Sequence, residues 1–244
     1  MPRPQIGKNV RIASTAVIHD NVIIGDNSVI EDFCVIGYPV ENAVGPLVIG
    51  QDSHIRSHSV LYEGSTFEYH LITGHSVLIR ENTIAGRYLQ VGTNSDIEGD
   101  CEIGHYVKVH TDVHISKHTI IHNLVWLFPR VQFTNDPFPP SKYCEGVEVH
   151  DLAVISTGSL LLPGITIGLA AFIGAGSLVR SSVPDLTCVS GSPAKKIATI
   201  GRFHNYRYKI SLPWPTHYRE GYPAESHKMM DDLLEKINNL KYTL

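Results

Sequence analysis

Histidine side chains are concentrated in the middle of this 244-residue chain, where nine of the 14 lie between positions 54 and 122. Imidazole titrates near neutral pH, so it commonly accepts a proton from an amine or hydroxyl that is becoming a nucleophile. Most of so many histidines must be surface residues. Selecting the chemically active ones therefore requires knowing which positions the fold brings together.

The fold is indicated by a six-residue repeat. Aliphatic residues recur at every sixth position over 6–36, 49–127 and 149–179, and within these runs only Thr73 and Ala85 are not bulky and apolar. Such a repeat predicts a parallel β-helix in which each coil stacks on the previous one. With three repeats to a coil of about 18 residues, we expect an all-β protein of about nine coils.

A second inward position follows four residues after each aliphatic one. It carries small side chains, as at Ser28, Ser59 and Cys101. This position and the next aliphatic one are two residues apart, so on a strand they share a face. The corners between strands are rich in Gly, Asn and Asp, which suit tight turns.

Two segments interrupt the repeat, and the repeat ends near Val183. We expect a β-helix over 1–183 with corner loops at 37–48 and 128–148. The remainder, 184–244, is expected to cap the open end of the coil stack. Helical spacing of apolar residues predicts a helix over about 225–241 within it.

Residues 18 apart should stack at the same place on successive coils. This predicts a corner column of Asn82, Asp100, His118 and, if the register survives the second interruption, Asp136. A carboxylate one coil away could orient and polarise an imidazole. His118 and His110 are therefore the leading candidates for a catalytic base. His114 stacks over Asp96 in the same way, but on a flat face.

The second loop carries polar and charged residues suited to substrate binding. Asn135 and Asp136 could fix a hydroxyl and an ammonium group, and the alternative is a local turn ahead of Pro137. Arg130 and, from an earlier coil, His75 are further candidates for substrate binding. Loops that interrupt a rigid scaffold are where binding residues concentrate.

Three features together resemble a known family. They are the repeat over 6–183, the segment VSGSPAKKI at 189–197, and FTNDPFP at 133–139. The chain resembles the left-handed β-helix, hexapeptide-repeat acyltransferases. The FTND segment is similar to a loop of the bacterial enzymes that N-acylate amino sugars carried on a nucleotide diphosphate.

The resemblance implies a left-handed helix and a homotrimer, with acetyl-CoA or another acyl-CoA bound between neighbouring columns. Ser177, Gly191, Lys195 and Lys196 are the expected CoA-proximal residues, and no metal is required. The expected reaction is N-acylation of a nucleotide-linked amino deoxysugar for surface polysaccharide, which includes lipopolysaccharide. O-acetylation on the same fold is the alternative.

Two other functions remain open from the residues. The γ-class carbonic anhydrases share this fold and bind zinc through histidines, and His105 with His110 reproduces their five-residue spacing. The third ligand position holds Tyr69, with His70 beside it. Catalytic zinc normally has three protein ligands, so that set is incomplete. A non-enzymatic scaffold would not require the charged, aromatic second loop.

Bulk composition restricts the partners. The net charge of −4 gives no general attraction to nucleic acid. No apolar run approaches the roughly 18 residues of a membrane span, and no signal peptide pattern precedes the repeat. Four scattered cysteines indicate neither a zinc cluster nor a disulfide framework. We therefore expect a cytoplasmic protein.

Overall fold

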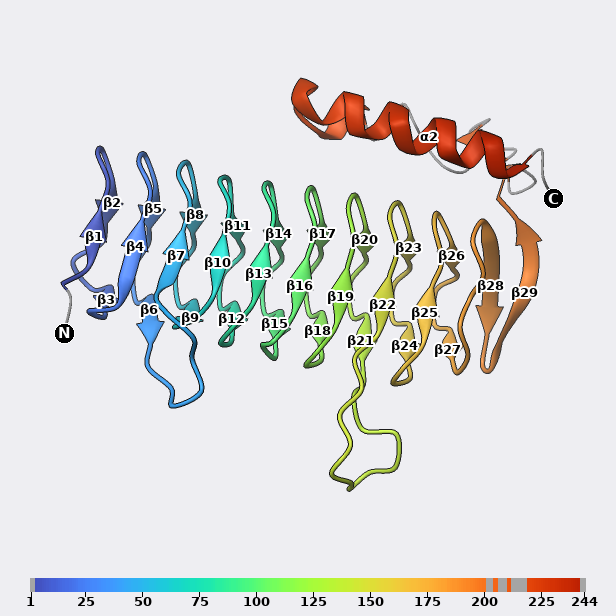
Figure 1. Ribbon diagram of the computed structural model, residues 1–244, viewed down its shortest axis with the longest axis horizontal. Helices are drawn as coiled ribbons and strands as arrows, with labels where there is room; N and C mark the ends of the chain where they lie inside the picture. The colour runs from blue at the N-terminus through green and yellow to red at the C-terminus, as the bar shows by residue number, and fades with distance from the viewer. Residues whose placement is uncertain (1–2, 201–203, 206–209, 212–218, 242–244) are drawn as a thin grey trace.

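The computed structural model describes residues 3–200, 204–205, 210–211 and 219–241. Short parallel strands stack into three flat sheets, which form the sides of a prism (Figure 1). Sheets A and C each contain nine strands and sheet B contains eleven, which confirms the expected parallel β-helix of about nine coils. The coils wind with a left hand (Figure 1).

Sheet A forms one side of the prism. Its strands, in order, are β1 (Gln5–Ile6), β4 (Val22–Ile24), β7 (Leu47–Ile49), β10 (Thr66–Phe67), β13 (Ile84–Ala85), β16 (Glu102–Ile103), β19 (Ile120–Ile121), β22 (Glu148–Val149) and β25 (Thr166–Ile167).

Sheet B forms the second side and continues into a final hairpin. Its strands are β2 (Arg11–Ile12), β5 (Val29–Ile30), β8 (His54–Ile55), β11 (Ile72–Thr73), β14 (Gln90–Val91), β17 (Lys108–Val109), β20 (Trp126–Leu127), β23 (Val154–Ile155), β26 (Phe172–Ile173), β28 (Thr187–Gly191) and β29 (Ala194–Thr199).

Sheet C forms the third side. Its strands are β3 (Val17–Ile18), β6 (Val35–Tyr38), β9 (Val60–Tyr62), β12 (Leu78–Ile79), β15 (Asp96–Ile97), β18 (His114–Ile115), β21 (Gln132–Phe133), β24 (Leu160–Leu161) and β27 (Leu178–Val179).

The register follows the repeat, since Gln90 pairs with Lys108 and Leu78 with Asp96, each 18 residues on. At the corners the chain turns through left-handed backbone, as at Asn94 and Asp112, where φ is 58° and 56°. Asn and Asp tolerate this conformation better than most residues. This explains why the sequence uses them between strands.

The interior is filled by the aliphatic positions and by small residues beside them. Buried hydroxyls are satisfied across coils: Ser95 Oγ donates to the carbonyl of His110 at 2.7 Å and accepts from the Val113 amide at 3.1 Å. The two exceptions to the aliphatic repeat, Thr73 and Ala85, are both buried. Thr73 Oγ1 accepts a hydrogen bond from the Arg56 amide at 2.9 Å. The buried hydroxyls of Ser95 and Thr73 therefore have backbone hydrogen-bond partners, as buried polar groups require.

Two loops leave the prism on the same side, at the corner between sheets C and A (Figure 1). The first connects β6 to β7 and the second connects β21 to β22. The second is shorter than the expected 128–148, because Gln132 still pairs with both His114 and Leu160. The chain therefore leaves the coil only after Phe133, which is fully buried.

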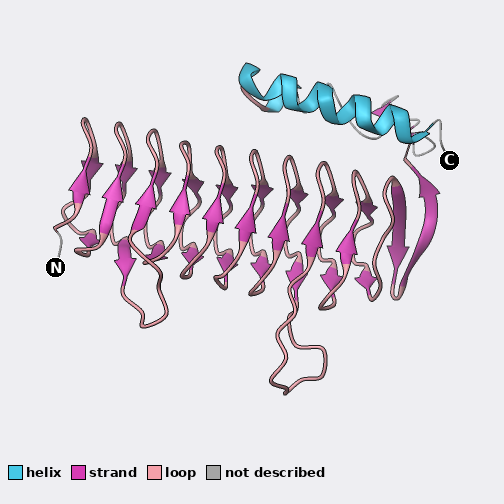
Figure 2. Cartoon of the chain, in the orientation of Figure 1, coloured by secondary structure: helices cyan, strands magenta, loops and turns pink. Residues whose placement is uncertain are grey.

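The C-terminal segment lies along sheet B. After β28 and β29, the strands β30 (His204–Asn205) and β31 (Ile210–Ser211) precede the 3₁₀ helix η1 (Ala224–Ser226) and α2 (His227–Lys241), the one α-helix in the described ranges (Figure 2). Tyr222 anchors the segment, because its hydroxyl accepts from Trp126 Nε1 and donates to the Tyr106 carbonyl, both at 2.7 Å. Residues 201–203, 206–209, 212–218 and 242–244 of the expected capping segment lie outside the described residues. Within the described ranges, no helix has both the length and the apolar composition needed to cross a bilayer.

Candidate functional site

The outward face of sheet C is aliphatic except at three neighbouring positions. Its register places Asp96, His114 and Gln132 side by side on consecutive coils. The outward residues of the other sheet C coils are Val17, Val35, Val60, Leu78, Leu160 and Leu178. The polar group therefore occupies one place along this face, close to the corner from which the second loop leaves.

His114 and Asp96 form an imidazole–carboxylate pair. Nδ1 of His114 lies 2.8 Å from Oδ2 of Asp96, and both side chains are roughly one-third exposed. The hydrogen bond to Asp96 raises the pKa of His114 from its ordinary value of 6.5, against the opposing effect of burial. Because Asp96 engages Nδ1, Nε2 is the ring nitrogen that can exchange a proton with a bound molecule.

Glu98 connects this pair to the second loop. Its Oε2 accepts hydrogen bonds from Asn135 Nδ2 at 2.9 Å and from the Lys117 amide at 3.1 Å. The negative charge of Glu98 also contributes to the raised pKa of His114. The Asn135 carbonyl accepts from the Glu145 amide at 2.8 Å, which closes the base of the loop. Asn135 is thereby held near the His114–Asp96 pair.

A network of charges fills the corner beside this group. Lys117 Nζ lies 2.7 Å from Oδ2 of Asp100 and 3.9 Å from Oε1 of the fully buried Glu81. The bond to Asp100 raises the pKa of Lys117, so the lysine remains charged. Asn42 of the first loop donates to Glu81 Oε1 at 3.0 Å, and Arg80 pairs with the same carboxylate. The first loop is thus also attached to this corner.

The expected column of Asn82, Asp100, His118 and Asp136 forms only in part. Asn82 Nδ2 donates to Asp100 Oδ1 at 2.9 Å. Asp100 then bonds to Lys117, and among the described residues the His118 ring makes no hydrogen bond or ion pair. His118 occupies a left-handed corner with φ 63°. The structure therefore pairs His114, and not His118, with a carboxylate.

Asp136 lies away from the column because the chain has already left the coil. Its carboxylate accepts from the amides of Phe138 and Ser141 and from the Ser141 hydroxyl. The hydroxyl bond lowers the pKa of this exposed aspartate. Gly146 takes the place above His118, where a Cβ would clash with the His118 carbonyl. The local-turn alternative therefore describes Asp136 in this structure, and a direct substrate contact requires a different loop conformation.

His110 lies at the opposite edge of sheet C, at the corner with sheet B. Its ring stacks on Phe128 with centroids 4.9 Å apart. Burial, with a smaller contribution from Lys108, lowers the pKa of His110. Lys108 itself lies over the ring of Trp126. These three residues, His110, Lys108 and Trp126, help to line a groove of about 710 Å³ on sheet B.

The two remaining candidates for substrate binding also lie at the corner between sheets B and C. Ser57 Oγ lies 2.9 Å from Nδ1 of His75, and the exposed Arg130 has its Nε 3.9 Å from Asp112. They are therefore separated from Asn135 by the width of sheet C. Within the single chain, His105 and His110 lie on opposite sides of β17, so one chain does not bring the suggested zinc pair together.

The expected CoA-proximal residues divide into two groups. Ser177 is buried inside the last coil and donates to the Gly174 carbonyl at 2.5 Å, so its side chain faces the core, and its contact with a cofactor stays a prediction. Gly191, Lys195 and Lys196 lie on the β28–β29 hairpin, where Gly191 has a φ of 106° that other residues rarely adopt. Both lysines are exposed.

A pocket of about 470 Å³ lies between this hairpin and the last coil. Lys196 and Arg180 supply cationic side chains to its lining, and Pro193 and Ala194 supply apolar surface. Arg180 was not singled out from the sequence, although it directly follows the last aliphatic repeat position. Glu98 and Lys117 were also missed, and stacking at 18-residue intervals could have placed both next to the candidate corner.

The repeat and the coil geometry define the class: the chain is a hexapeptide-repeat β-helix protein. The family described as bacterial transferase hexapeptide (six repeats) matches residues 3–38. The repeat is therefore recognisable in sequence as well as in structure. The chain is similar to acyltransferases built on the same repeat.

Individual relatives are distant. The chain is 24% identical over 194 residues to the bifunctional protein GlmU of Koribacter versatilis, covering 73% of this chain and 39% of that protein. It is 31% identical over 160 residues to the acyl-[acyl-carrier-protein]–UDP-N-acetylglucosamine O-acyltransferase of Nautilia profundicola. That match covers 60% of this chain and 53% of that protein. Among solved structures, Francisella novicida UDP-N-acetylglucosamine acyltransferase matches with a TM-score of 0.46 at 18% identity. The match covers 92% of this chain and 76% of that one. The chain spans about two fifths of the length of the first curated relatives that it matches.

Proposed function

We propose that this protein is an acyl-CoA-dependent N-acyltransferase that modifies the amino group of a nucleotide-linked amino deoxysugar. The observation that carries the proposal is the His114–Asp96 pair, at 2.8 Å, beside the Glu98-bound Asn135 of the second loop. An imidazole that can accept a proton and an amide that can orient an acceptor are groups that suit the aminolysis of a thioester.

In the proposed reaction the sugar amine attacks the thioester carbonyl carbon. His114 Nε2 accepts the proton that the nitrogen loses, and Asp96 stabilises the resulting imidazolium. Collapse of the tetrahedral intermediate breaks the carbon–sulfur bond and forms the amide. The imidazolium then returns the proton to the departing thiolate, so that CoA leaves as the free thiol.

The pocket at the last coil suits the other end of the donor. Lys196 and Arg180 line it, Lys195 lies on the same hairpin, and such cations bind phosphate groups well. From β18, which bears His114, to β27 at the pocket there are three strand steps along sheet C. At about 4.8 Å a step this is about 14 Å, which an extended pantetheine arm can span.

We further propose a homotrimer in which the aliphatic face of sheet C packs against a neighbouring subunit. Val17 on this face is 51% exposed in the single chain, and burying such side chains stabilises an interface. Flat-sided columns can pack about a threefold axis. His114 would then lie at a subunit boundary, within reach of residues at the other edge of the neighbouring sheet. Acyl-CoA and nucleotide sugars as substrates favour a cytoplasmic location.

O-acylation is the second candidate, because the relative from Nautilia profundicola is named as an O-acyltransferase that uses an acyl carrier protein. A hydroxyl acceptor depends on a base more strictly than a neutral amine does. The same site could serve either reaction, so the acceptor atom must be determined by experiment.

The test is a thiol-release assay with acetyl-CoA and dTDP- and UDP-linked sugars, each offered as an amino sugar and as its hydroxyl counterpart. Mass spectrometry of the product identifies the acylated atom. The proposal expects CoA release with an amino sugar and an amide product. Release only with hydroxyl sugars would replace it with O-acylation. No release with any acceptor, combined with no thermal stabilisation by acetyl-CoA, would refute acyl-CoA use.

A further inference from the structure

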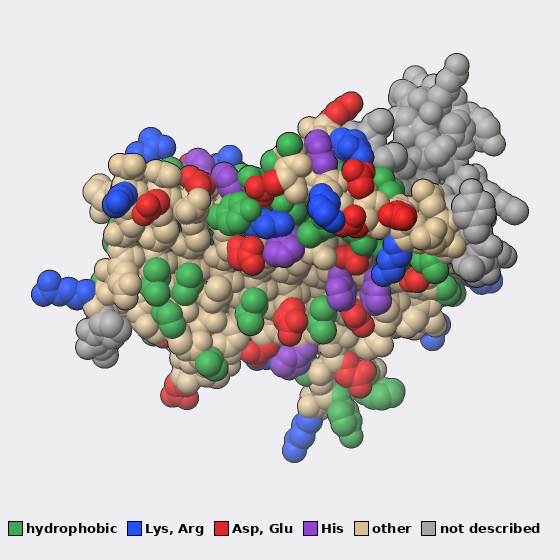
Figure 3. All heavy atoms as spheres, turned by 45° about the horizontal axis from the view of Figure 1, so that its top comes forward, with side chains coloured by type: hydrophobic (Ala, Val, Ile, Leu, Met, Phe, Trp, Pro, Cys, Tyr) green, Lys and Arg blue, Asp and Glu red, His purple; other side chains and the backbone are tan. Residues whose placement is uncertain are grey.

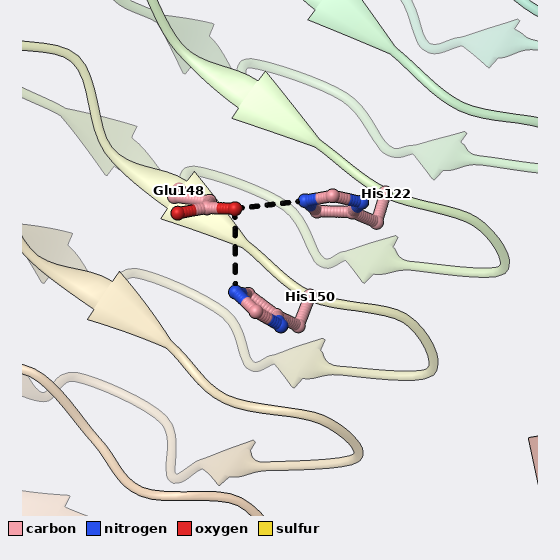
Figure 4. Close-up of side chains that lie close together, drawn as sticks. All are labelled: His122, Glu148 and His150. Atoms are coloured by element: carbon pink, nitrogen blue, oxygen red, sulfur yellow. Dashed lines mark hydrogen bonds and ion pairs between the residues drawn. The ribbon is translucent and has the colours of Figure 1, made fainter.

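A second group of titratable side chains lies away from the proposed acyl-transfer site, at the corner between sheets A and B. Figure 3 shows histidine and acidic side chains lying side by side on the visible face of the prism. In one such group, His122 and His150 both point their ring nitrogens at the carboxylate of Glu148 (Figure 4). This group has no part in the proposed reaction.

The contacts converge on one carboxylate oxygen. Oε1 of Glu148 lies 3.0 Å from His122 Nε2 and 3.3 Å from His150 Nε2. The two imidazole centroids are 5.0 Å apart. All three side chains are about two-fifths exposed, so the point between them can be reached from solvent.

The sequence at this corner sets the two histidines apart. The residue directly after each sheet A strand is glycine in six of nine coils, and a Cβ at Gly104 would come within 2.8 Å of the next coil. His122 and His150 replace that glycine on two consecutive coils. The remaining coil has Glu68 at this position. Besides Gly104, the glycines at this position are Gly7, Gly25, Gly50, Gly86 and Gly168.

We propose that His122, Glu148 and His150 form a binding site for a divalent transition metal ion, with Zn²⁺ as the best match. Two imidazoles and one carboxylate are ligands that Zn²⁺ accepts, and a water molecule would complete four-coordination. Zinc bonds of about 2.0–2.1 Å place tetrahedral ligands about 3.4 Å apart. The nitrogen-to-oxygen separations of 3.0 and 3.3 Å therefore already approach the edges of such a site.

The site would join the two coils on either side of the second loop. Ile120 pairs with Glu148 across a sequence separation of 28 residues, where coils without a loop, such as the one that pairs Gln90 with Lys108, use 18. The loop that carries Asn135 ends immediately before Glu148. A bound ion would fix the register at which the chain returns to the coil stack. This role is structural and is independent of the proposed acyl transfer.

The affinity should be moderate. Metal-bound imidazoles usually donate their second nitrogen to a protein acceptor, and loss of such a partner weakens binding by about 10–100-fold. Among the described residues, neither the Nδ1 of His122 nor that of His150 makes a hydrogen bond to a protein group. Within the described part of the chain, the proposed site therefore lacks that second hydrogen bond on both imidazoles.

The test is isothermal titration of Zn²⁺ into the full-length protein after treatment with EDTA and desalting. We expect one site per chain that weakens by at least about tenfold in His122→Ala and in His150→Ala. Glu148→Gln, which preserves side-chain size, should weaken it comparably. The control is His54→Ala, because His54 also contacts a carboxylate, Glu31 at 2.7 Å, but without a second histidine. This variant should bind Zn²⁺ like the wild type.

Circular dichroism establishes that each variant is folded before its titration is interpreted. Co²⁺ gives a second readout, since a tetrahedral site produces strong visible absorption that should be lost in the same variants. Absence of stoichiometric binding to the wild type would overturn the proposal. Binding that persists in folded His122→Ala and His150→Ala would also overturn it. Neither result bears on acyl transfer, so the two proposals fail independently.

Discussion

His114 Nδ1 lies 2.8 Å from Asp96 Oδ2, and the two residues occupy the same outward position on consecutive coils of sheet C. The pairing follows from the 18-residue coil, which places residues of matching register at strand spacing. A carboxylate fixed in this way raises the pKa of the imidazole and leaves Nε2 for proton transfer.

The first prediction concerns pH. His114 must be neutral to act as a base, so the rate should rise as pH increases through its raised pKa. Asp96→Asn removes the hydrogen-bonding carboxylate that chiefly raises this pKa. The acidic limb of the kcat/KM profile should therefore move to lower pH in Asp96→Asn. An unchanged limb would show that another group controls it.

The same pair has a consequence for folding. The pKa of His114 is higher in the folded protein than its ordinary 6.5, so the pair stabilises the fold below that value. This stabilisation is lost as pH rises through the folded pKa. Asp96→Asn should consequently lower Tm more in acidic buffer than in alkaline buffer. A loss of Tm that is equal at both would contradict the linkage.

The second prediction separates two neighbouring loop residues. Asn135 faces Glu98, whereas Asp136 bonds only within the loop. Asn135→Ala should lower kcat/KM by about 10–100-fold, the equivalent of a hydrogen bond to a charged group. Asp136→Ala should instead loosen the loop, which limited proteolysis can measure. A larger effect of Asp136→Ala on kcat with an unchanged cleavage rate would place Asp136 at the substrate.

The third prediction concerns the buried Glu81. Burial raises the pKa of Glu81, whereas the hydrogen bonds from Asn42 and Arg80 lower it. The lowering is larger, so the pKa lies below the ordinary 4.5. Its contribution to stability is present above 4.5 and is lost as pH falls through the folded pKa. Glu81→Ala should cost about 1–3 kcal/mol at neutral pH by leaving Asn42 and Arg80 without their partner. Chemical denaturation measures this, with the exposed Glu41→Ala as the matched control.

The fold was largely predictable because one six-residue spacing rule holds in every part of the coil stack outside the two loops. Even the exceptions Thr73 and Ala85 are buried, as the repeat requires. The same rule argues against Ser177, since it lies four residues after Ile173 at an inward position. Its assignment to the cofactor followed the family resemblance and not the repeat.

The site was harder to predict for two reasons. One of its residues lies on a loop outside the repeat, and the side chains at the corner have more than one possible hydrogen-bond partner. Stacking correctly places Asn82 next to Asp100, but it does not show that Lys117 reaches Asp100. Asp136 was placed by extending the register past Phe133, where the chain leaves the coil. His122 and His150 were not recognised as neighbours because the second loop separates them by 28 residues in place of 18.

The most direct measurement of the central claim is the rate of CoA release by His114→Gln, compared with wild type and with His54→Gln. His54→Gln alters another imidazole–carboxylate contact, on sheet B, and should retain the wild-type rate. Loss of a general base should reduce the rate of His114→Gln by about 10²–10⁴-fold while acetyl-CoA still binds. A wild-type rate of CoA release in His114→Gln would contradict the assignment of His114 as the base. The assignment would also be contradicted if His118→Gln lost about 10²–10⁴-fold in rate while His114→Gln did not.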